Sequence, residues 1–184
     1  MPELPEVETT IRGLKPIKGF VILNIKIHTP KLRFLIPKNI SLMDPNIIIK
    51  DIQRRGKFIL IYLNNNHCIV IHLGMSGRLR LYKKNFDRKK HDHFVIETSN
   101  SYFLVLNDAR RFGFIDFDTI GKIYEKKYLL NLGIDALDKR LSGKYLLSKI
   151  SNTMVPIKQI LLDQKIIAGI GNIYASEILF MSEI

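Results

Sequence analysis

The spacing of hydrophobic and polar positions changes twice along this chain, which divides it into three stretches. Near the N-terminus, Val7, Ile11 and Leu14 recur at helical spacing, so residues 3–14 are expected to form an amphipathic helix. From residue 20 to about residue 117, apolar residues alternate with polar ones or form short runs, which is typical of β-strands. Beyond residue 121 the spacing becomes helical again.

Eight short strands are predicted in the middle stretch, with turns rich in Asn, Gly and Ser between several of them. They cover residues 20–28, 47–55, 57–63, 68–73, 78–82, 93–98, 102–106 and 112–117. Short strands at this spacing are typical of antiparallel sandwiches and barrels. We therefore expect an α+β protein whose residues 1–125 form a β-sandwich or barrel-like domain flanked by helices.

The last stretch predicts helices over residues 122–132, 141–150 and 157–168, followed by a final helix after residue 171. Gly133 suits a helix stop, Pro156 suits a helix start, and Asn172 is expected to cap the final helix. Residues 126–140 are expected to form a linker and residues 141–184 a helical domain. This domain is expected to be incomplete, because the apolar face of the final helix is short of partners.

The charge balance favours a polyanion as partner. The chain has 29 Lys and Arg against 17 Asp and Glu, a net charge of +12, and proteins of this kind owe much of their nucleic-acid affinity to phosphate contacts. A Lys-, Ile- and Asn-rich composition inherited from an A+T-rich genome would give similar counts. Cys68 is the only cysteine, which excludes a disulfide framework and a cysteine-ligated zinc finger within one chain. We expect a cytoplasmic protein without a membrane partner, since no apolar run reaches 18 residues.

The first residues offer a candidate nucleophile. Initiator methionine is commonly removed before a small residue, which would expose the secondary amine of Pro2. An α-amino group titrates near pH 8, so part of it is neutral at pH 7 and can attack a sugar carbon to form a Schiff base. Glu3 is placed to donate or accept a proton in such a reaction. Taken alone, these residues are more simply explained as the start of a helix.

The rest of the chain changes that interpretation. Residues 1–9, Met-Pro-Glu-Leu-Pro-Glu-Val-Glu-Thr, resemble the start of the formamidopyrimidine-DNA glycosylases. Further segments resemble the same family in order and spacing: 55–57, 72–79, 90–93, 107–113, 161–164 and 168–175. The resemblance covers the whole chain.

The resemblance implies a role for each matching residue. Pro2 would be the nucleophile, Glu3 the proton donor in base release, and Lys57 the general acid of β-elimination as well as a phosphate contact. Chemistry on a base requires flipping it out of the duplex, and the vacated space is then filled by a wedge of side chains. The implied phosphate contacts are His72 and Asn172, the other DNA contacts His91 and Arg110, and the wedge Met75, Arg111 and Phe112.

Some features depart from the family or lead elsewhere. His91 and His93 alternate as a metal pair would, but no third ligand suggests itself, so a metal site is not expected. The family's four-cysteine zinc finger and the loop that covers the extruded base are absent from this sequence, so no cofactor is expected and the chain is expected to be truncated.

These observations predict a monomeric glycosylase and abasic-site lyase that removes formamidopyrimidine and 8-oxoguanine from double-stranded DNA. The alternative is a truncated remnant that binds DNA without efficient catalysis. A preference for oxidised pyrimidines stays open, and a basic RNA- or ribosome-associated module is a third, weaker possibility.

Overall fold

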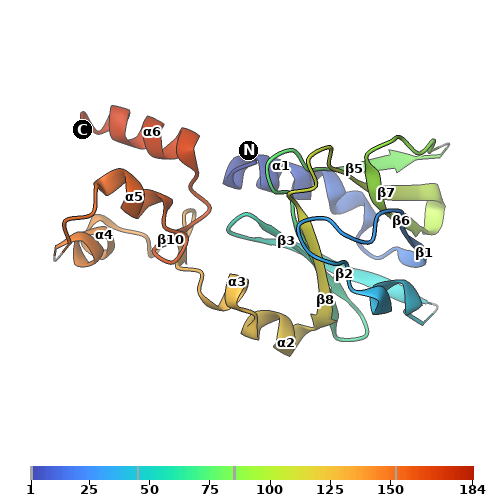
Figure 1. Cartoon of the computed structure of the whole chain (residues 1–184). Coiled ribbons are helices and arrows are strands. Elements are labelled where there is room, and N and C mark those ends of the chain that lie inside the picture. The colour runs from blue at the N-terminus through green and yellow to red at the C-terminus, as the bar shows by residue number, and fades with distance from the viewer. Residues whose placement is uncertain (1, 45, 85, 152) are drawn as a thin grey trace.

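The computed structural model describes residues 2–44, 46–84, 86–151 and 153–184, and it forms a sheet-rich lobe and a helical lobe (Figure 1). The longest helices are α1 (Leu4–Leu14), α4 (Gly143–Ile150) and α6 (Asn172–Met181). Shorter helices are α2 (Ile120–Glu125), α3 (Lys127–Leu130) and α5 (Ile157–Leu162). The strands are β1 (Val21–Ile27), β2 (Ile47–Arg55), β3 (Phe58–Leu63), β4 (His67–His72), β5 (Arg78–Lys83), β6 (Asp92–Thr98), β7 (Tyr102–Asn107), β8 (Phe114–Thr119), β9 (Ile134–Asp135) and β10 (Ile167–Ala168).

Strands β1 to β8 form one sheet in the order β5-β7-β6-β1-β2-β3-β4-β8, and all its pairings are antiparallel. Strand β1 joins the two halves, and both halves contribute to a single hydrophobic core. The apolar face of α1, including Val7 and Ile11, packs into this core. The expected α+β class with a barrel-like sheet is confirmed.

The central strands β3 and β4 are buried on both faces, which explains why they read as continuous apolar runs. Ile59, Ile61, Ile69 and Ile71 face the main core. The opposite side of the two strands, with Leu60 and Val70 among others, packs in a second cluster against α2 and α3.

The helical lobe contains α4, α5 and α6 around a small core of Leu161, Ile167, Ile170 and Ala175. Strands β9 and β10 pair in parallel inside this lobe. The N-terminus of α1 lies against it, because the Leu4 N–H donates to the Gly169 carbonyl at 3.2 Å.

The expected helix over residues 122–132 is wrong as a single element. The chain breaks it at Lys126, whose backbone is extended (φ −69°, ψ 132°), so that α2 and α3 are separate short helices. The Lys126 ammonium donates to both carboxylate oxygens of Asp116, at 2.8 and 2.9 Å. The helical spacing did not reveal this break, which is accompanied by an ion pair with a residue of β8.

The expected helix over residues 157–168 is also too long. Helix α5 ends at Leu162, and Ile167–Ala168 forms β10 instead. The side chain of Gln164 accepts from the Gly169 N–H at 2.9 Å and donates to the Ile170 carbonyl at 2.8 Å, which holds this segment in a turn. The Gly133 N–H also donates to the Gln164 carbonyl, so the turn is fixed by a residue more than thirty positions away in the sequence.

The eight predicted strands all form, with ends that differ by two residues or fewer. Strand β8 begins at Phe114 rather than at residue 112, because Arg111 adopts a positive φ of 56° in a turn before it. None of the helices in the described ranges has the length and apolar character needed to cross a membrane.

Candidate functional site

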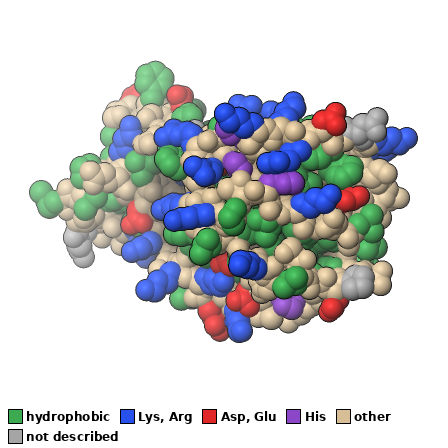
Figure 2. Space-filling model, turned by 45° about the vertical axis from the view of Figure 1, so that its right-hand side comes forward, with side chains coloured by type: hydrophobic (Ala, Val, Ile, Leu, Met, Phe, Trp, Pro, Cys, Tyr) green, Lys and Arg blue, Asp and Glu red, His purple; other side chains and the backbone are tan. Residues whose placement is uncertain are grey.

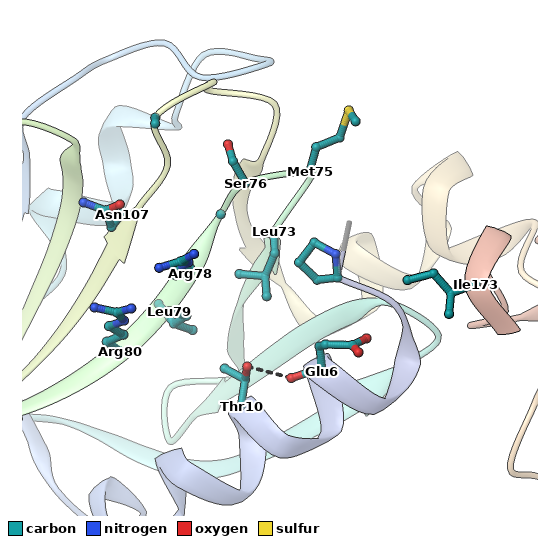
Figure 3. Close-up of a pocket in the computed structure, with 13 residues that line it drawn as sticks. Glu6, Thr10, Leu73, Met75, Ser76, Arg78, Leu79, Arg80, Asn107 and Ile173 are labelled. Carbon is teal, nitrogen blue, oxygen red and sulfur yellow. Dashed lines mark hydrogen bonds between the residues drawn. The ribbon is translucent and has the colours of Figure 1, made fainter.

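A cavity of about 890 Å³ opens where α1, β5 and the start of α6 meet. Figure 3 shows Arg78 and Arg80 of β5 on one side of it, and Glu6 of α1 and Ile173 of α6 on the other. Pro2 and Met75 also line it. The residue expected to supply the nucleophile therefore faces a space large enough for a small organic group.

Glu3 lies buried beside this cavity and is 2% exposed. Its carboxylate accepts hydrogen bonds from three backbone N–H groups at the start of α6: Gly171 and Ile173, both at 2.9 Å, and Tyr174 at 3.3 Å. These are groups that a helix N-terminus leaves without partners, and the helix dipole also favours a negative charge there. The expected cap Asn172 is wrong: Gly171 is the N-cap, and Glu3, 168 residues away, provides the capping carboxylate.

Lys57 lies directly before β3 and is 9% exposed. Burial lowers the pKa of its ammonium below the ordinary value, while the charge of Glu3 opposes this shift. The fold has thus brought a carboxylate and an amine of lowered pKa together from distant parts of the chain. Such pairs are common at catalytic sites.

His72, at the end of β4, has its ring 4.9 Å from that of Phe58 and 5.6 Å from that of Phe114. Burial, and next the charges of Lys57 and Arg33, lower the pKa of His72 to about 4. Its Nδ1 accepts a hydrogen bond from the Gly74 N–H at 3.1 Å, so in the neutral ring the proton is on Nε2. His72 is therefore a neutral hydrogen-bond donor with a fixed tautomer.

The residues expected to form the wedge lie on two adjacent loops, residues 73–77 between β4 and β5 and residues 108–113 between β7 and β8, which we call the wedge loops. Met75 and Phe112 are 45% and 44% exposed, although both are large and apolar. The guanidinium of Arg110 lies 4.6 Å from the centre of the Phe112 ring. Gly74 has φ +63°, and a Cβ there would lie 2.4 Å from the carbonyl carbon of Phe112, so only glycine permits the two loops to approach so closely.

Comparison with known proteins identifies the arrangement. Residues 1–115 match the family model of the formamidopyrimidine-DNA glycosylase N-terminal domain, and residues 132–184 match that of the formamidopyrimidine-DNA glycosylase H2TH domain. The chain belongs to the formamidopyrimidine-DNA glycosylase family.

Comparison with individual proteins supports the same family. The formamidopyrimidine-DNA glycosylases of Rickettsia bellii and Zymomonas mobilis are 42% and 43% identical to the whole chain. The chain covers 67% and 68% of these relatives, so it spans about two thirds of their length. The Lactococcus lactis Fpg in complex with abasic-site DNA is 30% identical, with a TM-score of 0.89 over 100% of this chain and 68% of that one.

Two further residues expected from the glycosylase family, Asn172 and His91, do not line the cavity. Asn172 is exposed at the first position of α6, and His91 is half-buried just before β6. The neighbouring His93 uses both ring nitrogens within the protein, with Thr29 Oγ1 at 2.7 Å and the Asp108 carbonyl at 2.9 Å, which leaves no nitrogen of that ring for the metal pair considered above.

Sequence reasoning missed three residues of this glycosylase site. The backbone N–H of Arg33 donates to the Gly113 carbonyl at 3.0 Å, and the positive charge of Arg33 contributes to the lowered pKa of His72. Glu6 lines the cavity with Pro2, and its carboxylate accepts from the Glu3 N–H at 2.9 Å. Asp108 is a buried acid between the two wedge loops. Only the folded chain shows the contacts of Arg33 and Asp108, whereas Glu3 and Glu6 have the three-residue spacing of a capping box, which could have been found in the sequence.

The surface of this family member is rich in positive charge. Figure 2 shows Lys and Arg side chains over much of one face, with His side chains among them and fewer Asp and Glu side chains. A basic surface of this kind attracts phosphate groups over distances comparable to the Debye length.

Proposed function

We propose that this chain is a DNA glycosylase with abasic-site lyase activity, which acts in the base-excision repair of oxidised purines. The observation that carries the proposal is that Pro2 lines the cavity next to the buried Glu3, whose charge also acts on the ammonium of Lys57 from a distant part of the chain. Related structures hold abasic-site DNA, Fapy-dG DNA and carbocyclic 8-oxo-G DNA. The chemistry proposed here uses groups of the chain alone and requires no cofactor.

In the first step, the amine of Pro2 attacks C1′ of the damaged nucleotide, and the bond from C1′ to the base breaks. The departing base takes one proton, and the ring oxygen takes another as the sugar opens. The Pro2 nitrogen supplies one of these by giving up its N–H, and water supplies the other. Glu3 is the nearest carboxyl group in the sequence and is held by three N–H donors, so we assign the proton transfers to it. The product is an iminium ion, the Schiff base of a secondary amine, between the Pro2 nitrogen and C1′ of the opened sugar.

In the second step, water takes the proton from C2′, a C2′–C3′ double bond forms, and the bond between C3′ and its oxygen breaks. The phosphate leaves with a proton from the general acid, which cleaves the strand by β-elimination. We assign Lys57 to this step, because burial brings the pKa of its ammonium closer to the working pH, where proton transfer is most effective. A lysine at this place also neutralises a phosphate.

The DNA is held by the basic face. We propose that the Nε2–H of His72 donates to a backbone phosphate and that Asn172, His91 and Arg110 make further contacts with the DNA. Met75, Arg111 and Phe112 enter the duplex where the damaged nucleotide leaves it, since two of them are apolar and exposed.

Borohydride trapping tests the proposal. The processed protein is expected to form a covalent adduct with abasic-site DNA, because borohydride reduces the Schiff base. Pro2→Gly, which replaces the secondary amine with a primary one, should give less adduct, and a protein that retains Met1 should give none. Undiminished adduct with Met1 retained would show that Pro2 is not the nucleophile.

The same assay separates the alternatives. Binding to abasic-site DNA without any adduct would identify a protein that holds DNA but does not catalyse. Release of 8-oxoguanine and formamidopyrimidine from duplexes, compared with release of an oxidised pyrimidine, then measures the substrate preference.

A further inference from the structure

Asp108 is a buried carboxylate for which the reaction proposed above has no use. It lies directly after β7 and is 0% exposed. Among the described residues no ion pair reaches it. A buried charge without a cation is costly unless hydrogen bonds satisfy it, so its partners indicate what the acid is for.

Those partners belong to the two wedge loops. One carboxylate oxygen accepts from the hydroxyl of Ser76, the residue after Met75, at 2.5 Å. The other accepts from the N–H of Gly113, the residue after Phe112, at 2.8 Å. A single side chain thus holds both loops at the positions next to their exposed apolar tips.

Ser76 extends the link in a second direction. Its hydroxyl oxygen accepts from the Arg110 N–H at 3.1 Å while the hydroxyl proton is donated to Asp108. The Asp108 carbonyl accepts from the Arg111 N–H at 3.2 Å, in the turn where Arg111 has a positive φ of 56°. Each of the three wedge residues is therefore at most one residue from a hydrogen bond that involves Asp108 or Ser76.

The acid is itself fixed from behind. The imidazole of His93 donates from Nε2 to the Asp108 carbonyl at 2.9 Å, and the Asp108 N–H donates to the His91 carbonyl at 3.0 Å. Because β6 and β7 are paired strands of the main sheet, the carboxylate has a rigid base.

We propose that Asp108 is a positioning residue that joins the two wedge loops, so that Met75, Arg111 and Phe112 enter duplex DNA as one rigid unit. The inference rests on the proposed function, in which these residues form the wedge. Unstacking a duplex step costs a few kcal/mol, and loops that moved independently would lose part of the contact energy that opposes this cost.

The direct test measures unstacking without chemistry. A duplex carries a stable, unreactive abasic-site analogue opposite 2-aminopurine, whose fluorescence rises when it leaves the stack. At saturating protein the original chain should raise the emission, and Asp108→Asn should raise it less, because an amide cannot accept from both loops. Ser76→Ala removes the hydrogen bonds of the hydroxyl with Asp108 and Arg110 but keeps the one between Gly113 and Asp108. It should have a smaller effect in the same direction, which keeps the test valid if Asp108→Asn folds poorly.

Two variants serve as controls. Ser76→Thr retains the hydroxyl and should restore the emission. Thr98→Val removes another buried hydroxyl, which donates to the Tyr102 carbonyl at 3.1 Å in the same sheet, and it should leave the emission unchanged. The rate of borohydride trapping should change in the same way. Asp108→Asn should be trapped about tenfold more slowly on an abasic site in duplex DNA, and at nearly the original rate on the same site in a single strand, where no wedge is needed.

Wild-type emission from both Asp108→Asn and Ser76→Ala would overturn the proposal. So would an equal loss with Thr98→Val, which would indicate general loosening, or no emission change with the original chain. If the emission changes as expected but the original chain and its variants form no borohydride adduct, the proposal for Asp108 stands and the proposed catalysis is wrong.

Discussion

At the scale of single residues, the site depends on side chains whose charge state is set by burial. His72 is the clearest case, because its ring lies among aromatic rings and beside the cations Lys57 and Arg33, which all favour the neutral form. A neutral imidazole with its proton on Nε2 can donate to a phosphate at any pH above about 5, since its pKa is about 4.

This depressed pKa has a consequence for stability. Between pH 6.5 and about 4 the unfolded chain binds a proton at His72 and the folded chain does not. The free energy of unfolding should therefore fall as the pH is lowered through this window. His72→Gln should reduce the fall, as measured by urea unfolding at pH 7 and pH 4.5. His67→Gln, at the other end of β4, is the matched control; if both substitutions change the pH dependence equally, the shift does not arise from the site around His72.

Lys57 permits a test that separates its two proposed roles. Lys57→Ala should slow strand cleavage at a pre-formed abasic site by about 100-fold, the usual contribution of a general acid. Lys57→Arg keeps the positive charge for a phosphate but holds its proton too tightly to transfer it, so it should bind DNA and still cleave slowly. Cleavage restored by arginine would mean that only the phosphate contact matters.

At the scale of elements, the junction between the N-terminus of α1 and that of α6 decides where the proposed catalytic groups lie. The Glu3 carboxylate approaches the α6 backbone so closely that a Cβ on Gly171 would lie 2.3 Å from its carboxyl carbon. Gly171 has an ordinary φ of −124°, so this close approach, and not backbone strain, requires glycine.

Gly171→Ala should therefore push Glu3 away from its three donors. We expect a loss of about 1–3 kcal/mol in the free energy of unfolding from the steric conflict alone, together with loss of adduct formation. Gly13→Ala provides the comparison, since a Cβ there meets nothing within 4 Å and the change should stabilise α1 by about 0.4–1 kcal/mol. Both quantities can be read from thermal unfolding and borohydride trapping; normal trapping by Gly171→Ala would show that the Glu3 contact is dispensable.

At the scale of the whole molecule, an ion-pair network fixes the helical lobe against the sheet. Arg54 of β2 donates to Glu8 of α1 at 3.1 Å and to Asp135 of β9 at 2.6 and 3.0 Å. Burial alone would raise the pKa of Asp135, but hydrogen bonds from Arg54 and from the Gly56 N–H lower it below its ordinary value. Since Gly56 precedes Lys57, the network also determines where the proposed acid of elimination stands.

Asp135→Asn should therefore affect both stability and catalysis. The substitution leaves the buried Arg54 with Glu8 as its remaining ion-pair partner, so the cost should reach at most about 3 kcal/mol. Asp138→Asn removes a comparable carboxylate whose partner Arg140 is exposed, and it should change little. Urea unfolding and trapping of the two variants compare the effects directly, and equal stability of the two would contradict the assignment of this network to lobe docking.

Some properties were determined by the sequence alone. Strands such as Ile47–Arg55 could be predicted because alternation and apolar runs reflect which side of a strand is buried, and the pattern does not depend on the partner strand. The candidate residues Pro2, Glu3 and Lys57 were likewise available from motifs, since reactive groups keep fixed places within short segments.

Only the tertiary structure decided how these segments meet. The break at Lys126, the pairing of β9 with β10, the capping of α6 by Glu3 and the joining of two loops by Asp108 all depend on contacts between distant residues. Local spacing reports burial and periodicity, but it does not say which distant donor will satisfy a given acceptor. The groups of this site are therefore encoded locally, whereas their geometry follows from long-range packing and hydrogen bonding.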